Sequence, residues 1–218
     1  MHVAELWRYP VKSMGGERLE RAVVGPLGIE GDRLVQVLRP DGRVATARTF
    51  PGLLGHNGSL GADGEPLVDG RSWREPSVAA EASRIVGAGS RLVFDDGPGR
   101  FDVLPLLVAT DGAIAEFGSD GRRLRPNIVV GGVTGLAERD WEGRFLRIGD
   151  VVIAIDDLRG RCVMTTYDPD TLEQDRDVLL GIIRRFDGKL ALNAGVLSGG
   201  ELAVGDPVEL LEHPPGPA

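Results

Sequence analysis

The sequence has 218 residues, and its 25 basic and 33 acidic side chains give a formal net charge of −8 at pH 7. This length allows one large domain or two small ones, with a sizeable hydrophobic core in either case. The acidic balance argues against nucleic-acid binding, which needs basic residues concentrated on one face, so we expect no nucleic-acid partner.

The cysteine content and the hydropathy pattern exclude further classes. The one cysteine cannot form an internal disulfide, and by itself it cannot hold a structural zinc or an iron–sulfur cluster. No stretch approaches the roughly 18 uninterrupted apolar residues of a membrane-spanning helix, and the N-terminus lacks the apolar region of a signal peptide. We therefore expect a cytoplasmic protein with no membrane partner.

Short segments with apolar residues at every second position make up most of the chain, and Gly, Pro or Asp-Gly separates them. This alternation predicts half-buried strands at residues 2–8, 18–24 and 33–39, and Asp41-Gly42 predicts a hairpin after the third. Residues 61–77 are polar and rich in Gly and Pro, which favours a mobile loop or a junction between subdomains. Further strands are predicted at residues 91–94, 127–131, 144–148, 151–156, 161–166, 189–197 and 207–211.

Three helices are predicted. Residues 77–86 follow Pro76, with Ser77 as a possible N-cap, and a short helix begins after Thr110 or Asp111 and ends at Gly118. The clearest helix is 175–187, with Gly188 as its stop. Its apolar face consists of Leu179, Ile182, Ile183 and Phe186. Together these elements predict a β-rich α+β fold, a distorted barrel with a few covering helices.

Few residues offer familiar catalytic chemistry. The three histidines, two of them near the termini, give little basis for a hydrolytic triad or a histidine metal site. The glycine runs "GPLGIEGDR" and "VGGVTG" do not match a dinucleotide or phosphate-loop fingerprint in a strand–helix context, which disfavours NAD and ATP chemistry.

The lone cysteine, Cys162, lies in the polar stretch "DLRGRCVMTTYDPDT" directly after Arg161. A neighbouring arginine favours the thiolate, which is both a nucleophile and a soft metal ligand. The alternative is a buried, inert thiol that packs like a small apolar side chain, and the immediate sequence leaves that alternative open.

Several cations could accompany this thiol. Lys12 and Ser13 follow a strand in "RYPVKSMGGE", an arrangement that suits an anion such as phosphate. Arg33 opens a strand in "GDR", and Arg125 precedes Pro126 in "RRLRPNIVV". Each of these could equally be an ordinary solvated side chain, but together they supply three cations and a thiol for one anionic cofactor.

The words "YPVKSMGGE", "LGIEGDR", "RRLRPNIVV", "LRIGD" and "RCVMTTYDPDT" occur here in the order seen in MOSC-domain proteins. The chain resembles this family from about residue 3 to about residue 212. The family includes relatives of the mitochondrial amidoxime-reducing component and of the C-terminal domain of molybdenum cofactor sulfurase. The resemblance implies a MOSC N-terminal β-barrel-like part at residues 1–90 and a MOSC-type barrel domain at residues 91–213, followed by a disordered tail at residues 214–218.

The resemblance also assigns roles to particular residues. Cys162 would be the protein's ligand to molybdenum, and Asn127 and Asp168 would support the surrounding loops. The residues that would contact the molybdenum cofactor (Mo-molybdopterin), through its phosphate, its pterin or the same pocket, are Lys12, Ser13, Arg33, Thr110, Arg125 and Arg161.

The implied activity is that of an oxidoreductase that removes oxygen from a small-molecule N-hydroxylated substrate such as an amidoxime. Because no chain follows residue 218 and no further cysteine exists, we expect a separate electron donor, such as a ferredoxin, a flavin reductase or a cytochrome b5-like protein. A pyridoxal-phosphate domain does not fit in this length, so that cofactor is not expected. Two alternatives remain: a non-catalytic carrier of molybdenum cofactor or sulfur, and a scaffold that has lost the cofactor.

Overall fold

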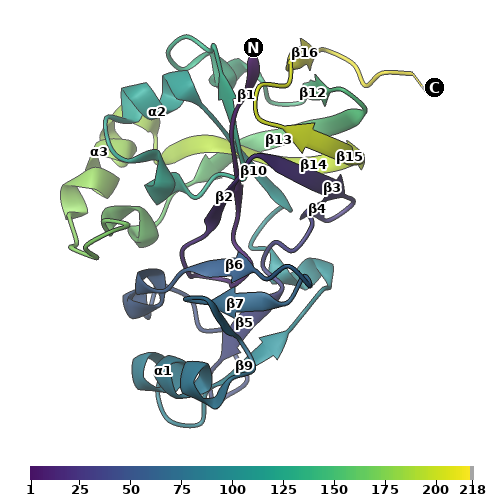
Figure 1. Ribbon diagram of the computed structural model, residues 1–218. Helices are drawn as coiled ribbons and strands as arrows, with labels where there is room; N and C mark the ends of the chain where they lie inside the picture. Colours follow the sequence, from purple (N-terminus) through teal and green to yellow (C-terminus); the bar gives the residue numbers. More distant parts are fainter. Residues whose placement is uncertain (217–218) are drawn as a thin grey trace.

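The computed structural model describes residues 1–216 and has the predicted β-rich α+β class, built around one large mixed sheet (Figure 1). Within residues 1–216 this sheet stays open, because its edge strands do not pair into a closed barrel. Its strands, in spatial order, are β16 (Glu209–Leu211), β12 (Phe145–Ile148), β13 (Val151–Gly160), β14 (Lys189–Ser198), β10 (Leu106–Thr110), β11 (Ile128–Gly131), β1 (His2–Arg8) and β2 (Glu17–Leu19).

The remaining strands form three small sheets. One contains β15 (Gly200–Ala203), β3 (Arg21–Gly25) and β4 (Gly28–Ile29), and a second pairs β5 (Val35–Leu38) with β9 (Arg91–Phe94). The third contains β6 (Gly58–Leu60), β7 (Pro66–Val68) and β8 (Arg71–Ser72). Two of these strands, β7 and β8, lie within residues 61–77, for which a mobile loop or a junction between subdomains was expected.

One parallel pair shapes the large sheet. β10 and β11 run parallel, whereas the other neighbours in this sheet are antiparallel. A parallel connection needs a crossover, and here it carries the helix α2 (Asp111–Phe117) and the 3-10 turn η3 (Gly121–Leu124). All five side chains of β10 are buried, so this strand lacks the period-two alternation of a half-buried strand such as β3.

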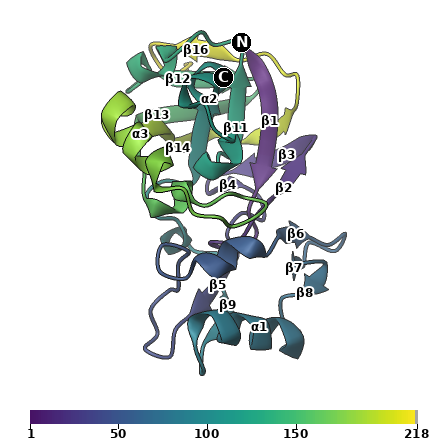
Figure 2. The ribbon, with the colours of Figure 1, turned by 90° about the vertical axis from the view of Figure 1, so that its left-hand side faces the viewer.

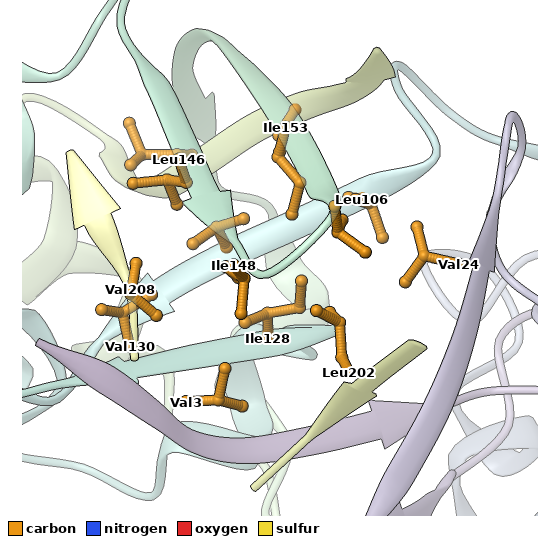
Figure 3. Packing of buried hydrophobic residues seen from close by; sticks show 14 of the residues in the cluster. Val3, Val24, Leu106, Ile128, Val130, Leu146, Ile148, Ile153, Leu202 and Val208 are labelled. Atoms are coloured by element: carbon orange, nitrogen blue, oxygen red, sulfur yellow. The ribbon is translucent and has the colours of Figure 1, made fainter. Parts of the chain in front are cut away.

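Two main hydrophobic clusters lie in different parts of the molecule. The larger one is formed by side chains from the large sheet and from the sheet of β3 (Figure 3). Leu6, Ile128 and Ile153 in this cluster are fully buried. The second includes Val37, Leu53 and residues of the helix α1 (Pro76–Val86). The ribbon of α1 lies beside β5 and β9 in the lower part of Figure 2. The expected domain boundary near residue 90 stays a prediction.

The helices form where the sequence predicts them, with local differences. The side chain of Thr110 caps α2 by accepting a hydrogen bond from the Ala113 N–H at 3.1 Å, and Gly118 ends it in the left-handed conformation. The N-cap of α1 is Glu75, because Pro76 occupies the first helical turn ahead of the expected cap, Ser77.

The third helix, α3 (Arg176–Phe186), packs on α2 and β14 through Ile182 and Phe186. Ile183, which was assigned to the same apolar face, is 50% exposed. The buried positions repeat every four residues, so the contacting face is narrower than expected. None of the helices in residues 1–216 is long and apolar enough to cross a membrane.

Two further expectations need correction. Residues 161–166 were predicted as a strand, but β13 ends at Gly160 and the chain turns into η5 (Val163–Thr166), a 3-10 turn. The turn at Asp41-Gly42 forms, yet beyond it Val44 makes only a single bridge to Leu38, and β5 pairs with β9 instead. The other 3-10 turns are η1 (Pro51–Gly55), η2 (Pro98–Arg100) and η4 (Ala137–Asp140). The expected disordered tail lies partly outside the described residues.

Candidate functional site

A cleft of about 820 Å³, part of it open to solvent, lies beside the first residues of β10, the residue that precedes β11 and the end of β13. We call it the basic cleft, because seven cationic side chains and one carboxylate line it. These charged residues are Lys12, Arg33, Arg48, Arg123, Arg125, Arg159, Arg161 and Asp102, and the lining also includes Ser13 and Cys162. In a protein with a net charge of −8, such a concentration of positive charge indicates a site for an anion.

Cys162 is a free, half-buried thiol that lines this cleft. It is positioned by the turn η5, because its carbonyl accepts hydrogen bonds from the Thr165 N–H at 3.0 Å and the Thr165 hydroxyl at 2.9 Å. Its neighbours Arg159 and Arg161 line the same cleft. The structure therefore does not match the alternative of a thiol sealed among apolar side chains.

Arg161 is half-buried beside this cysteine. Burial lowers the pKa of Arg161 to about 10, against the opposing effect of negative charge on Cys162. The guanidinium remains protonated at pH 7, since that pKa still lies three units higher. It donates a hydrogen bond to the Leu124 carbonyl at 2.7 Å, which joins the cysteine loop to η3.

Lys12, Arg48 and Arg159 converge on one carboxylate, that of Asp102. The nitrogen–oxygen distances to Asp102 are 2.9 Å for Lys12, 2.7 Å for Arg48 and 3.6 Å for Arg159. Burial would raise the pKa of Asp102, but the hydrogen bond and charge of Lys12, together with the two arginines, lower it overall. A single carboxylate leaves most of the positive charge of these groups uncompensated.

Three of the predicted site residues have a backbone conformation that side chains other than glycine rarely adopt. The φ angles are 70° at Ser13, 56° at Arg33 and 58° at Arg125. A non-glycine residue in this left-handed region costs free energy and is retained where the surroundings hold it. All three line the basic cleft, so the strained positions coincide with the candidate site.

A buried polar network behind the cleft holds Arg33. Asp32 is fully buried, pairs with the Arg33 guanidinium and accepts a hydrogen bond from the Tyr9 N–H at 2.7 Å. Asn127 donates to the Asp32 carboxylate at 3.2 Å and accepts from the Leu107 N–H at 3.1 Å. Asn127 thus ties the N-terminal residues of the site to β10, which agrees with the supporting role expected for it.

Arg125, like Arg161, pairs with no carboxylate within residues 1–216. Its guanidinium lies 4.3 Å from the centre of the Tyr9 ring, a cation–π contact. Burial lowers the pKa of Arg125 to about 10 and raises that of Tyr9 to about 12. Arg125 therefore keeps a positive charge at pH 7, and no carboxylate of the described residues forms an ion pair with it.

Two buried guanidinium nitrogens, Nε of Arg123 and Nε of Arg161, have no hydrogen-bond partner among the described residues. Buried donors of this kind are uncommon, because leaving one unpaired costs free energy. Both arginines line the basic cleft, so their donors fit a site whose ligand supplies acceptor oxygens.

Thr110 is the one predicted site residue that does not line the cleft. It is fully buried, caps α2 and contacts the Glu138 carboxylate at 3.3 Å. Thr110 ends β10, whereas the cleft adjoins Leu106 at the start of the same strand. Four residues of extended strand separate the two by roughly 13 Å.

The sequence interpretation missed four charged residues of the cleft. Arg48, Arg123, Arg159 and Asp102 carry no motif of their own, and nothing in the sequence distinguishes these arginines from the other scattered basic residues. The sequence feature that could have identified one of them is the position of Arg159, three residues before Cys162. Alternation continued one residue past the end of β13 would place Arg159 and Arg161 on the same side of the chain.

Models of two protein families match the chain: the MOSC N-terminal beta barrel domain at residues 1–68 and the MOSC domain at residues 112–209. The basic cleft draws residues from both matched regions. Mitochondrial amidoxime-reducing component 1 from Homo sapiens is 27% identical to the chain and covers 96% of it, with 82% of that protein aligned.

Mitochondrial amidoxime reducing component 2 from Homo sapiens is also 27% identical, over 84% of this chain and 72% of that protein. Among solved structures, the YUAD protein from Bacillus subtilis superimposes with a TM-score of 0.54 at 14% identity, over 98% of this chain and 96% of that one. This structural likeness supports the fold alone.

Proposed function

Since the chain belongs to the family of MOSC-domain proteins, we propose that its basic cleft binds a molybdenum cofactor, with the Cys162 thiolate as the protein's ligand to the metal. Family membership supports a function related to this cofactor. The observation that carries the proposal is that the free thiol opens into the same cleft as seven cations.

The residues of the cleft fit the chemistry of such a group. A thiolate is a suitable ligand for a soft metal, and lysine and arginine side chains form strong charge-assisted hydrogen bonds to phosphate. Lys12, Arg33 and Arg125 would bind the phosphate and orient the pterin, and Ser13 would donate its hydroxyl. The unpaired Nε donors of Arg123 and Arg161 would find acceptors in the same ligand.

The proposed reaction is the reduction of an N-hydroxylated compound. An amidoxime takes up two electrons and two protons, its N–O bond breaks, and an amidine and water are released. When bound, the cofactor supplies the two-electron redox chemistry, while the protein binds and orients it. The names of the amidoxime-reducing relatives support this substrate class. A separate ferredoxin, flavin reductase or cytochrome b5-like protein would deliver the electrons.

The first test measures metal ligation. The protein and its Cys162→Ser variant are purified from a host that synthesises molybdenum cofactor, and bound molybdenum is measured along with the number of sulfur neighbours by X-ray absorption. We expect the variant to lose one sulfur neighbour and most of its molybdenum, because a hydroxyl is a poor substitute for a soft thiolate. Equal molybdenum with an unchanged number of sulfur neighbours in the variant would refute ligation by Cys162.

The second test measures catalysis. The molybdenum-loaded protein is supplied with reduced viologen and benzamidoxime, and benzamidine formation is followed. Turnover that requires the loaded metal would support the oxidoreductase. Loaded protein that forms no benzamidine, while handing its cofactor to an acceptor protein, would instead support the carrier function.

A further inference from the structure

A second cavity, of about 560 Å³ with part of it open to solvent, adjoins the basic cleft and shares Arg123, Arg125 and Met164 with it. We call it the aromatic cavity, because three aromatic rings and three apolar side chains dominate its walls. These six residues are Trp7, Tyr9, Leu54, Met164, Tyr167 and Pro169. The two cavities thus have a common boundary, and Met164 lies only two residues beyond Cys162.

The charges around the aromatic cavity are balanced, unlike those of the basic cleft. Arg122 pairs with Asp120 and Asp170, each at 2.7 Å, and Arg123 pairs with Asp168 at 2.9 Å. Their positive charge is therefore already compensated by carboxylates, and only Arg125, at the boundary, has no acidic partner within residues 1–216. An anion gains less here than in the basic cleft, and Arg125 repels a cation.

Two adjacent glycines keep the floor of the aromatic cavity flat. A Cβ atom on Gly16 would collide with the Tyr9 ring, and one on Gly15 would collide with the Asn57 side chain. Both glycines line the cavity, so the chain passes beneath it without filling it. Aromatic walls around such a space favour a flat, apolar ligand.

We propose that the aromatic cavity binds the uncharged aromatic body of the substrate, while its N-hydroxyl group reaches past Met164 to the Cys162 side of the basic cleft. This inference rests on the proposed function and narrows its substrate class to neutral aryl amidoximes and related N-hydroxylated compounds. The anionic cofactor and the neutral substrate then occupy neighbouring cavities, one with excess positive charge and one in which arginine charge is largely balanced by carboxylates.

The test compares two substrates in the molybdenum-loaded full chain. Benzamidoxime has the aromatic body, whereas acetamidoxime carries the same reacting group on a methyl. Trp7→Ala and Tyr167→Ala should each raise the KM for benzamidoxime about tenfold, and that for acetamidoxime by about twofold or less, since only the ring contacts are lost. Phe94→Ala, an exposed aromatic residue outside both cavities, is the matched control and should change neither value.

Binding without turnover provides an independent measurement. In molybdenum-free protein of unchanged sequence, nuclear magnetic resonance should show magnetisation transfer from the Trp7 indole to the ring protons of benzamidoxime. This signal tests the cavity even if the variants fold poorly. If the indole contact appears but loaded protein never turns over, the proposed reaction fails and the aromatic site stands.

The inference is overturned by either of two results. One is efficient turnover with equal KM changes for both substrates, or with none, in folded variants that retain their molybdenum. The other is a loss of molybdenum from Trp7→Ala and Tyr167→Ala but not from Phe94→Ala, because the cavity would then hold part of the cofactor.

Discussion

The basic cleft and the aromatic cavity share a wall, but they differ in how far carboxylates neutralise their arginines. In the aromatic cavity, Arg122 and Arg123 are paired with carboxylates of residues 120, 168 and 170. In the basic cleft, the single carboxylate of Asp102 forms ion pairs with Lys12, Arg48 and Arg159. Arg125 has no acidic partner among the described residues. A count of arginines therefore says little about what a cavity binds. The arrangement of carboxylates around the arginines decides whether charge remains for a ligand.

Asp32 holds one lining residue of each cavity, Tyr9 of the aromatic cavity and Arg33 of the basic cleft. Asp32→Ala should break both cavities at once and lower the free energy of unfolding by about 3–5 kcal/mol, because it leaves a largely buried guanidinium and a buried N–H without a partner. Urea denaturation measures this change. Asp150→Ala, at an exposed position, is the control. A loss at Asp32 no larger than that of the control would contradict the structural role.

Charge reversal at Arg125 tests whether this unpaired cation, at the boundary between the two cavities, contributes to cofactor binding. Arg125→Glu should weaken cofactor retention by about 2 kcal/mol or more, since it removes a charge-assisted hydrogen bond and repels phosphate. Molybdenum retained after dialysis measures the effect. Arg91→Glu makes the same charge change at an exposed position outside both cavities and should leave retention unaltered. Unchanged retention in Arg125→Glu would remove this residue from the site.

The smallest expected effect comes from removing the negative charge of the basic cleft. Asp102→Asn removes the one carboxylate of the basic cleft and should tighten the binding of inorganic phosphate to molybdenum-free protein about threefold, because three cations are released. Titration calorimetry measures this change. Weaker phosphate binding in the variant would mean that Asp102 matters more for positioning the cations than for its charge.

The same variant has a pH signature. Lys12 and the neighbouring arginines outweigh burial and lower the pKa of Asp102, so the folded protein favours the ionised carboxylate. Its contribution to stability is fully present above the unfolded pKa of about 3.9 and is lost as pH falls through the lower folded value. The stability difference between the protein and Asp102→Asn should therefore shrink below about pH 4. A difference that stays constant there would contradict the ion pairing.

Much of the fold was predictable from local signals. Alternation located β1 and β12 closely, and the cap at Thr110 and the stop at Gly118 located α2. Local signals failed where tertiary contacts override them. β10 is buried on both faces and has no alternation, and residues 163–166 form a 3-10 turn although their composition suggests a strand.

The candidate site was predicted in part for a similar reason. The ordered motif words led to Lys12, Ser13, Arg33, Arg125, Arg161 and Cys162, and these six residues line one cleft. They also suggested Thr110, because the start of a helix can bind an anion. Thr110 lies at the end of β10, however, and the cleft lies at the start of that strand. Arg48 and Asp102 have no motif to identify them, and only their meeting in space reveals their part in the site.

The sequence by itself determined the β-rich class, most elements and the residue types available for anion and metal binding, because alternation, caps and motif words are encoded within a few neighbouring residues. The tertiary structure decided which charges remain without a partner. Ion pairs such as those of Lys12 with Asp102 and Arg123 with Asp168 join segments far apart in the chain. Electrostatic energy depends on distance in space, and a linear pattern does not contain that distance.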